Sequence, residues 1–372
     1  MHVAMYGPLG WIVTYWYVLL IESLIGLFAV GALSIGASRL VGSEPRSLGR
    51  LRASIYLTLV FTVLAYLSIA IGVAYLLGPG SGSQLLLIAV GLVAVFGLVQ
   101  WLASPWLINL SYRARPPSSP RERRVEAVLG EMARRAGLSR PPRLRIVDTP
   151  VPNAFAYGSP VAGSYVAVTR GLLDMMDDGE VEAVLGHELG HLKHRDVAWI
   201  LALSIVPLAL YFIGRSLLYA GLFTRGSREE NNAALYYLAV GALLIALGFA
   251  TRLIIAHFNR LREYYADAFS TINYGRGREL QRALAKIHLV LSRRGARKAL
   301  PSLDIARALY IVAPLIEVSG GLFYGSVDPV VESLKREETS PLEEVLSTHP
   351  PVPKRLRFID HLVASLQRGE QY

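Results

Sequence analysis

The sequence of 372 residues contains no cysteine and few charged residues. The absence of cysteine excludes disulfide bonds and thiolate metal ligands. Charged residues make up only 18% of the chain and hydrophobic residues 53%, a balance too apolar for an ordinary soluble protein. From Ala53 to Tyr112 there is no Asp, Glu, Lys or Arg at all. The composition therefore indicates a protein that lies partly in a membrane.

The uncharged stretch is too long for a single membrane span. About 60 residues of helix would extend about 90 Å, about three times the hydrocarbon thickness of a bilayer. The Gly- and Ser-rich segment 78–83 is the expected turn. It divides the stretch into predicted spans over about 54–77 and 84–104, and the apolar segment 11–38 predicts a span before them.

Two further apolar segments, Val197–Gly214 and Ala233–Thr251, are predicted as the fourth and fifth spans, with a polar loop from Thr224 to Asn232 between them. The alternative is a pair of buried core helices, because Pro207 and Arg215 interrupt the first segment. Residues 306–325 are also apolar, but they contain charged residues and predict a buried or membrane-contacting helix rather than a sixth span.

The formal net charge of +10 does not indicate a nucleic-acid partner, because the arginines cluster beside the apolar segments and no nucleic-acid-binding motif is present. The loops after the first and third predicted spans are rich in Arg. By the positive-inside rule, the N-terminus lies outside and residues 113–196 lie in the cytoplasm, as does everything after about residue 258. This predicts a multi-pass protein of the plasma membrane.

Residues 113–196 have the pattern of a soluble α+β segment. Ser119-Pro120 predicts the N-cap and first turn of an amphipathic helix that ends near Gly137. Strands are expected at 144–147, 154–157 and 165–168, each bounded by Gly, Pro or Ser. The acidic segment 177–180 then predicts the start of another helix.

That last helix contains the sequence His187-Glu188-Leu189-Gly190-His191, an H-E-x-x-H pattern. Helical spacing places the two imidazoles one turn apart on the same face, where both reach one zinc ion, and Glu188 lies between them as a candidate general base for water. Chance also produces this pattern, so a third ligand and a suitable context are needed.

A zinc site of this kind needs a third protein ligand. His194 lies about 10 Å along the helix axis from His187, too far to share one ion, and is expected to be a surface or interfacial histidine. The metzincin pattern also fails, because its Gly and last His are replaced by His194 and Val197. Glu263 is the better candidate, with Asp267 one turn on to accept the free N–H of a ligating His. The alternative is a surface carboxylate pair.

These residues resemble the HtpX-type membrane metallopeptidases, which belong to the same superfamily as the zinc-type CaaX prenyl proteases. The matching segments are Asn153-Ala154-Phe155-Ala156, the H-E-x-x-H pattern, Glu263 with Ala266-Asp267, and Thr348-His349-Pro350-Pro351 with Arg355. Two features depart from the family. HtpX proteins usually have two predicted spans before the catalytic domain, whereas three are predicted here, and the segment 275–340 matches no motif.

The resemblance implies a polytopic α-helical membrane protein with a zincin-like (gluzincin) α+β catalytic domain in the cytoplasm. The expected organisation is three spans in residues 1–112, the first part of the catalytic domain in 113–196, two spans in 197–257, and the rest of the domain in 258–372. Residues Asn153 to Ala156 would form the sheet edge that binds substrate by β-augmentation. His349 would stabilise the oxyanion and Arg355 would brace the site, although His349-Pro350-Pro351 also suits a loop before the last helix.

The expected activity is zinc-dependent hydrolysis of peptide bonds, with one Zn²⁺ per chain held by His187, His191 and Glu263. The expected substrates are membrane or misfolded proteins, in proteolytic quality control at the cytoplasmic face. One alternative is a CaaX-type protease of prenylated C-termini, which would be favoured by a large chamber built from more spans. Another is a transporter or scaffold with a vestigial zinc site, which would be favoured if Glu188 were replaced. The sequence leaves the oligomeric state open.

Overall fold

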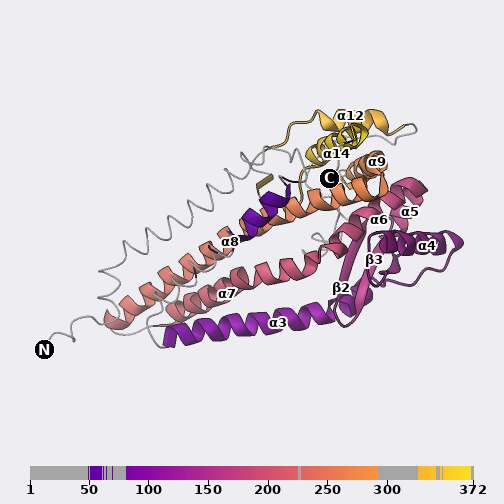
Figure 1. Ribbon diagram of the computed structural model, residues 1–372. Coiled ribbons are helices and arrows are strands. Elements are labelled where there is room, and N and C mark those ends of the chain that lie inside the picture. The colour runs from indigo at the N-terminus through magenta and orange to yellow at the C-terminus, as the bar shows by residue number, and fades with distance from the viewer. Residues whose placement is uncertain are drawn as a thin grey trace. The chain divides into compact units, whose positions relative to one another are not determined.

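The computed structural model describes residues 49, 51–60, 62, 64, 69, 81–224, 228–291, 326–340, 344–345 and 347–369 (Figure 1). The predicted span 11–38, most of the span 54–77 and the apolar segment 306–325 lie outside these residues. The chain divides into two compact units. One includes Tyr56–Leu98 and Ile200–Ile255, and the other includes Val41–Ile55, Val99–Trp199 and Ala256–Tyr372. These units are defined by packing, so the four domains expected from the sequence stay a prediction.

Among the described residues, three long helices carry apolar segments of sufficient length to cross a membrane (Figure 1). They are α3 (Ser81–Ser111), α7 (Asp196–Phe223) and α8 (Arg228–Tyr274). Large apolar side chains along α3 are exposed, such as Leu92 at 67% and Phe96 at 65%. An exposed apolar surface of this extent suits contact with lipid. Three of the predicted spans thus coincide with candidate membrane helices.

The boundaries of these helices differ from the sequence prediction. Helix α3 begins at Ser81 instead of 84, and α7 continues through Pro207 and Arg215 to Phe223. The polar loop expected from Thr224 to Asn232 ends earlier than predicted, because α8 begins at Arg228. Hydropathy detects only the apolar part of a helix, whereas polar residues with good helix propensity extend it beyond that part.

Within the first unit, α7 and α8 approach each other closely at two glycines. A Cβ atom on Gly214 would lie 2.7 Å from the carbonyl oxygen of Gly241, and one on Gly241 would lie 2.7 Å from that of Gly214. Small residues allow backbones to approach in this way between membrane helices. The buried residues Leu210, Val240 and Leu244 pack beside this contact. The glycines therefore explain how two adjacent apolar helices pair.

The second unit is built on a three-stranded sheet of strand order β1-β3-β2. Strand β1 (Arg143–Val147) pairs parallel with β3 (Gly163–Thr169), and β2 (Ala154–Ser159) pairs antiparallel with β3. The three strands expected from the sequence are confirmed. Strand β2 is an edge strand, since β3 is the one described strand that pairs with it.

Helices cover one face of this sheet and form the main core. Helix α4 (Pro120–Arg135) contacts β1, and α6 (Asp178–Lys193) contacts β2 and β3. The short helix α5 (Arg170–Met175) links β3 to α6, while α9 (Gly277–Leu291), α12 (Asp328–Lys335) and α14 (Val352–Gln367) pack around them. The core joins buried residues of all these layers: Leu129, Ile146, Val166, Leu185, Leu284 and Ile359. Apolar residues at helical and strand spacing on the inner faces explain this layering.

Aromatic residues fill the opposite face of the sheet. Phe155, Tyr157 and Tyr165 are buried there, and Ile108 and Tyr112 at the end of α3 pack against them. The Tyr157 hydroxyl donates to Asn109 Oδ1 at 2.7 Å, which ties the strand to the helix. The end of α3 is therefore part of the packing that fixes β2.

Candidate metal centre

The helix that carries the H-E-x-x-H pattern is held at its N-terminus by a complete capping box. The Asp177 side chain accepts from the backbone N–H of Glu180, and the Glu180 side chain accepts from that of Asp177. Glu180 is 1% exposed and pairs with Lys286 of α9 at 2.6 Å. The predicted helix start is confirmed, and this partly buried ion pair orients α6 against α9.

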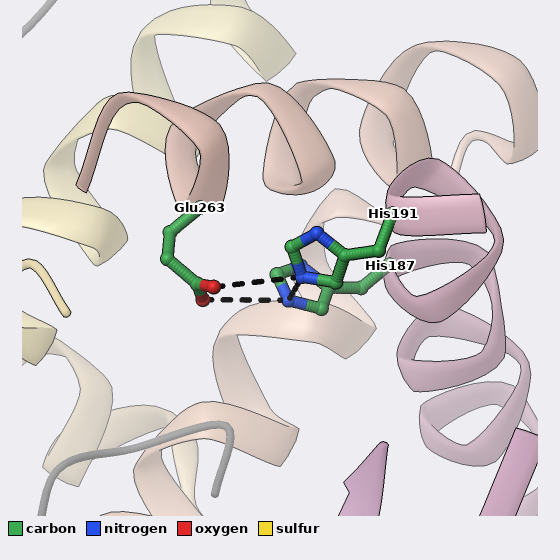
Figure 2. Close-up of side chains that lie close together, drawn as sticks. All are labelled: His187, His191 and Glu263. Carbon is green, nitrogen blue, oxygen red and sulfur yellow. Dashed lines mark hydrogen bonds and ion pairs between the residues drawn. The ribbon is translucent and has the colours of Figure 1, made fainter. Parts of the chain in front are cut away.

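Two imidazoles of α6 and one carboxylate of α8 converge on one point (Figure 2). The Nε2 atoms of His187 and His191 are 3.1 Å apart. Glu263 Oε2 lies 3.6 Å from Nε2 of His187, and Oε1 lies 3.5 Å from Nε2 of His191. His187 is fully buried and Glu263 is 2% exposed. The structure thus brings together the three residues that the sequence singled out as ligands, and their binding of zinc stays a prediction.

The distances between these donor atoms fit one zinc ion. Bonds of about 2.0–2.1 Å in a tetrahedral site place ligand atoms about 3.4 Å apart, close to the three distances observed. More carboxylates than guanidinium groups surround the site. The carboxylates are those of Glu188, Asp196, Glu263 and Asp267, and the guanidinium groups are those of Arg262 and Arg355. With neutral imidazoles the site therefore has an excess of negative charge, which a divalent cation would balance.

Burial alone would lower the pKa of His187, but the neighbouring carboxylates Asp267 and Glu263 outweigh it and raise the pKa to about 9. The same carboxylates that favour a proton on this imidazole also favour a metal cation in its place. The electrostatics and the distances therefore agree on a cation site.

Asp267 and Arg355 form a buried pair behind the ligands. Asp267 Oδ1 lies 2.9 Å from Nδ1 of His187, as expected for a carboxylate that orients a ligating imidazole. Arg355 of α14 donates to both oxygens of Asp267, at 2.8 and 2.6 Å, and its Nη1 is 3.5 Å from Glu263 Oε2. Arg355 is fully buried. One guanidinium thus braces both carboxylates of α8, while its role in the reaction stays a prediction.

Asp196 is a residue of this site that sequence reasoning did not identify. Its Oδ2 lies 2.6 Å from Nδ1 of His191, and Arg262 lies between Asp196 at 3.3 Å and Glu263 at 3.4 Å. Asp196 begins α7, directly after Arg195, whose φ of 55° is left-handed. This turn brings the aspartate back onto the helix that precedes it. Each candidate histidine ligand therefore has its own carboxylate.

Glu188 is 2% exposed and belongs to the same helical turn as the two histidines, but it is not among the three converging residues. Burial raises its pKa above the usual value of a glutamate, and the charges of His191 and His187 oppose this rise. The backbone N–H of Ala156 in β2 also opposes the rise in the pKa of Glu188. A buried carboxylate with a raised pKa beside a metal site is suited to accept and return a proton.

His349 lies beside Glu263, next to the candidate metal ligands. Its Nδ1 is 3.4 Å from Glu263 Oε2, and the side chain is 10% exposed. Arg260 of α8 holds the segment before it by donating to the carbonyl oxygens of Ser347 at 2.6 Å and Val345 at 3.2 Å. The position of His349 beside the candidate ligands is compatible with its predicted role at the substrate carbonyl, which stays a prediction.

His194 does not join the three converging residues. It is the C-cap of α6, where its Nδ1 lies 2.6 Å from the carbonyl oxygen of Gly190. Its ring packs edge-on against Tyr265 and Phe269 of α8. The structure therefore places His194 at an interface between helices, as expected from its distance along the axis.

We expect Arg355→Met to destabilise the protein by about 3–5 kcal/mol, the usual cost of removing one partner from a buried ion pair. Asp267 would keep a buried negative charge without its guanidinium partner. The measurement is thermal unfolding in detergent. Arg368→Met, the same change at the exposed end of α14, is the control and should leave the midpoint unchanged. Equal midpoints for both variants would contradict a bracing role for Arg355.

Comparison with known proteins found a matching family model, similar sequences and a solved structure. The profile described as Peptidase family M48 matches residues 119–363. The "Protease HtpX homolog" of Aeropyrum pernix is 49% identical over 296 residues, which cover 79% of this chain and 91% of that protein. The "Protease HtpX homolog" of Archaeoglobus fulgidus is 35% identical over 310 residues, covering 83% and 87% respectively. Among solved structures, S. mikatae Ste24p aligns with a TM-score of 0.49 and 20% identity, over 83% of this chain and 67% of that one.

Proposed function

Because the chain belongs to peptidase family M48, we propose that it is a membrane-embedded zinc metalloendopeptidase with one Zn²⁺ held by His187, His191 and Glu263. The observation that carries the proposal is the convergence of these donor atoms, all within 4.8 Å of one another, beside the buried carboxylate of Glu188. The three long apolar helices support the membrane location.

A zinc ion held by these residues would act as a Lewis acid that polarises the scissile carbonyl and lowers the pKa of a water molecule. Glu188 accepts the proton of that water and later delivers it to the leaving amine. Asp267 and Asp196 hold the imidazoles of His187 and His191 in the orientation in which Nε2 faces Glu263. His349 donates toward the oxyanion that develops on the carbonyl oxygen.

The free edge of β2 holds the substrate backbone. Strand β2, which contains Ala154 to Ala156 of this segment, packs against the catalytic helix α6, and the backbone N–H of Ala156 lowers the pKa of Glu188. An extended substrate segment that adds to this edge lies with its backbone beside the general base. Backbone pairing requires an unfolded segment but no particular sequence, which suits the proposed substrates, misfolded or membrane proteins in quality control.

We further propose that the catalytic domain lies in the cytoplasm and that the protein is in the plasma membrane. The argument is the distribution of Arg, which is concentrated in the loops after the first and third predicted spans. The continuity of α8 supports a site close to the bilayer, because the helix that contains Glu263 also contains a candidate span.

This orientation predicts the outcome of cysteine labelling, for which the native chain is a clean background since it has no cysteine. Single cysteines at Gly82 and Arg228 should react with an impermeant maleimide added to intact cells. Cysteines at Ser118 and Ser340 should react only after the cells are opened. External labelling at Ser118 would overturn the five-span arrangement and the cytoplasmic catalytic domain.

A further inference from the structure

The backbone groups of β2 alternate between its partner strand and its free edge. The Thr169 N–H donates to the carbonyl oxygen of Asn153 at 2.9 Å, and the register continues this pair as Phe155 with Ala167 and Tyr157 with Tyr165. In an antiparallel ladder, residues at every second position exchange hydrogen bonds with the partner, and the residues between them point the other way. The N–H and C=O groups of Ala154, Ala156 and Gly158 therefore face the free edge.

One contact agrees with this assignment. The carbonyl oxygen of Gly158 accepts a hydrogen bond from Nε1 of Trp101 at 3.0 Å. Trp101 belongs to α3, and the neighbouring Leu102 carbonyl oxygen accepts from the Ser159 hydroxyl at 3.1 Å. The far end of the edge is thus closed by α3, while its Ala154 and Ala156 positions lie near the catalytic helix.

The closure is built into the local structure on both sides. Pro105 provides no N–H for the carbonyl oxygen of Trp101, and the Ser104 hydroxyl donates to that oxygen instead, at 2.9 Å. Gly158 has no space for a side chain, because a Cβ atom would lie 2.8 Å from the carbonyl oxygen of Gly163. The indole N–H and its acceptor are therefore held by the helix and by the hairpin, respectively.

From this contact we propose that Trp101 limits the length of the substrate strand, because it occupies the third hydrogen-bonding position of the edge. A substrate pairs with Ala154 and Ala156, and its backbone ends or turns away before Gly158. This proposal rests on the proposed peptidase function and on substrate addition to β2. Trp101 is then a specificity-determining residue: it sets how many substrate residues on one side of the scissile bond contribute to binding.

The test uses nested peptides built around one cleavage site mapped in β-casein, lengthened one residue at a time at each end. For the wild-type protein, kcat/KM should rise with each residue added at the peptide end that extends away from Gly158. At the end that approaches Gly158, kcat/KM should become constant after the first few residues. In Trp101→Ala the early limit should disappear, and each newly paired residue should raise kcat/KM by about 2- to 10-fold, as expected for one backbone hydrogen bond. Trp101→Phe keeps a ring but removes the donor, and should show the same gain at the same end.

The control is Trp106→Ala, a change at an exposed tryptophan on the same helix, which should keep the wild-type length dependence. Zinc content verifies the fold of each variant. The proposal is overturned if Trp101→Ala and Trp101→Phe both keep the wild-type dependence on length. Failure of the peptidase function itself is distinguishable, because Glu188→Gln would then cleave the peptides as well as the wild type does.

Discussion

Glu188→Gln abolishes peptide hydrolysis without loss of zinc or of the fold; this is the expected result with the largest effect on activity. Glutamine has nearly the volume of glutamate, so the buried position next to Ala156 stays filled. It cannot accept a proton from water. A general base contributes about 10²–10⁴-fold, and the loss of water activation adds to this, so a decrease of several orders of magnitude is expected.

The measurement is cleavage of casein in detergent with added zinc, with zinc content and thermal midpoint determined for the same preparations. His349→Ala gives a graded comparison, because a residue that only stabilises the oxyanion should cost about 10²-fold. Equal activity of wild type and Glu188→Gln would mean that a contaminating protease cleaves the casein, or that this chain is no peptidase and the non-enzymatic alternative holds.

The residues of the site that sequence reasoning identified are those with a local pattern. His187 and His191 are one turn apart on a helix, and Glu263 and Asp267 are one turn apart on another, so periodicity alone predicts the shared face of each pair. The capping signals at Ser119 and Asp177 are equally local, and the structure confirms both helix starts.

The site residues that the sequence does not predict depend on contacts between distant segments or on one unusual backbone conformation. Asp196 reaches His191 only because Arg195 adopts a left-handed conformation, which is uncommon for a residue other than glycine. Arg260 acts on a loop that is more than eighty positions away in the sequence. The contact of Trp101 with Gly158 joins a candidate membrane helix to the sheet. Spacing in the sequence contains no signal for any of these pairs.

The lengths of the long helices are also predicted poorly from the sequence. Hydropathy marks where a helix is apolar, whereas α8 continues without interruption from Arg228 to Tyr274. Its apolar part and its site residues, Glu263 and Asp267, thus belong to one helix. The candidate ligand Glu263 therefore lies on the same continuous helix as the predicted fifth span.

The second large effect concerns the metal. Glu263→Gln should lose most of the zinc, since an amide oxygen is a far weaker zinc ligand than a carboxylate and the charge that balances the cation is removed. Elemental analysis of protein purified without added zinc measures the occupancy, and dialysis against a chelator compares how fast each variant loses the ion.

His194→Ala is the matched control, because His194 caps the helix that carries the two candidate histidine ligands but contacts Tyr265 and Phe269 rather than the converging donor atoms. This variant should retain about one zinc per chain, although it removes an imidazole close in sequence to His191. Loss of zinc in His194→Ala together with full occupancy in Glu263→Gln would refute the ligand assignment. A loss of zinc in Glu263→Gln alone would support Glu263 of α8 as the third ligand. The ion would then link α6 to α8, and its binding free energy would stabilise the packing of these helices in the catalytic domain.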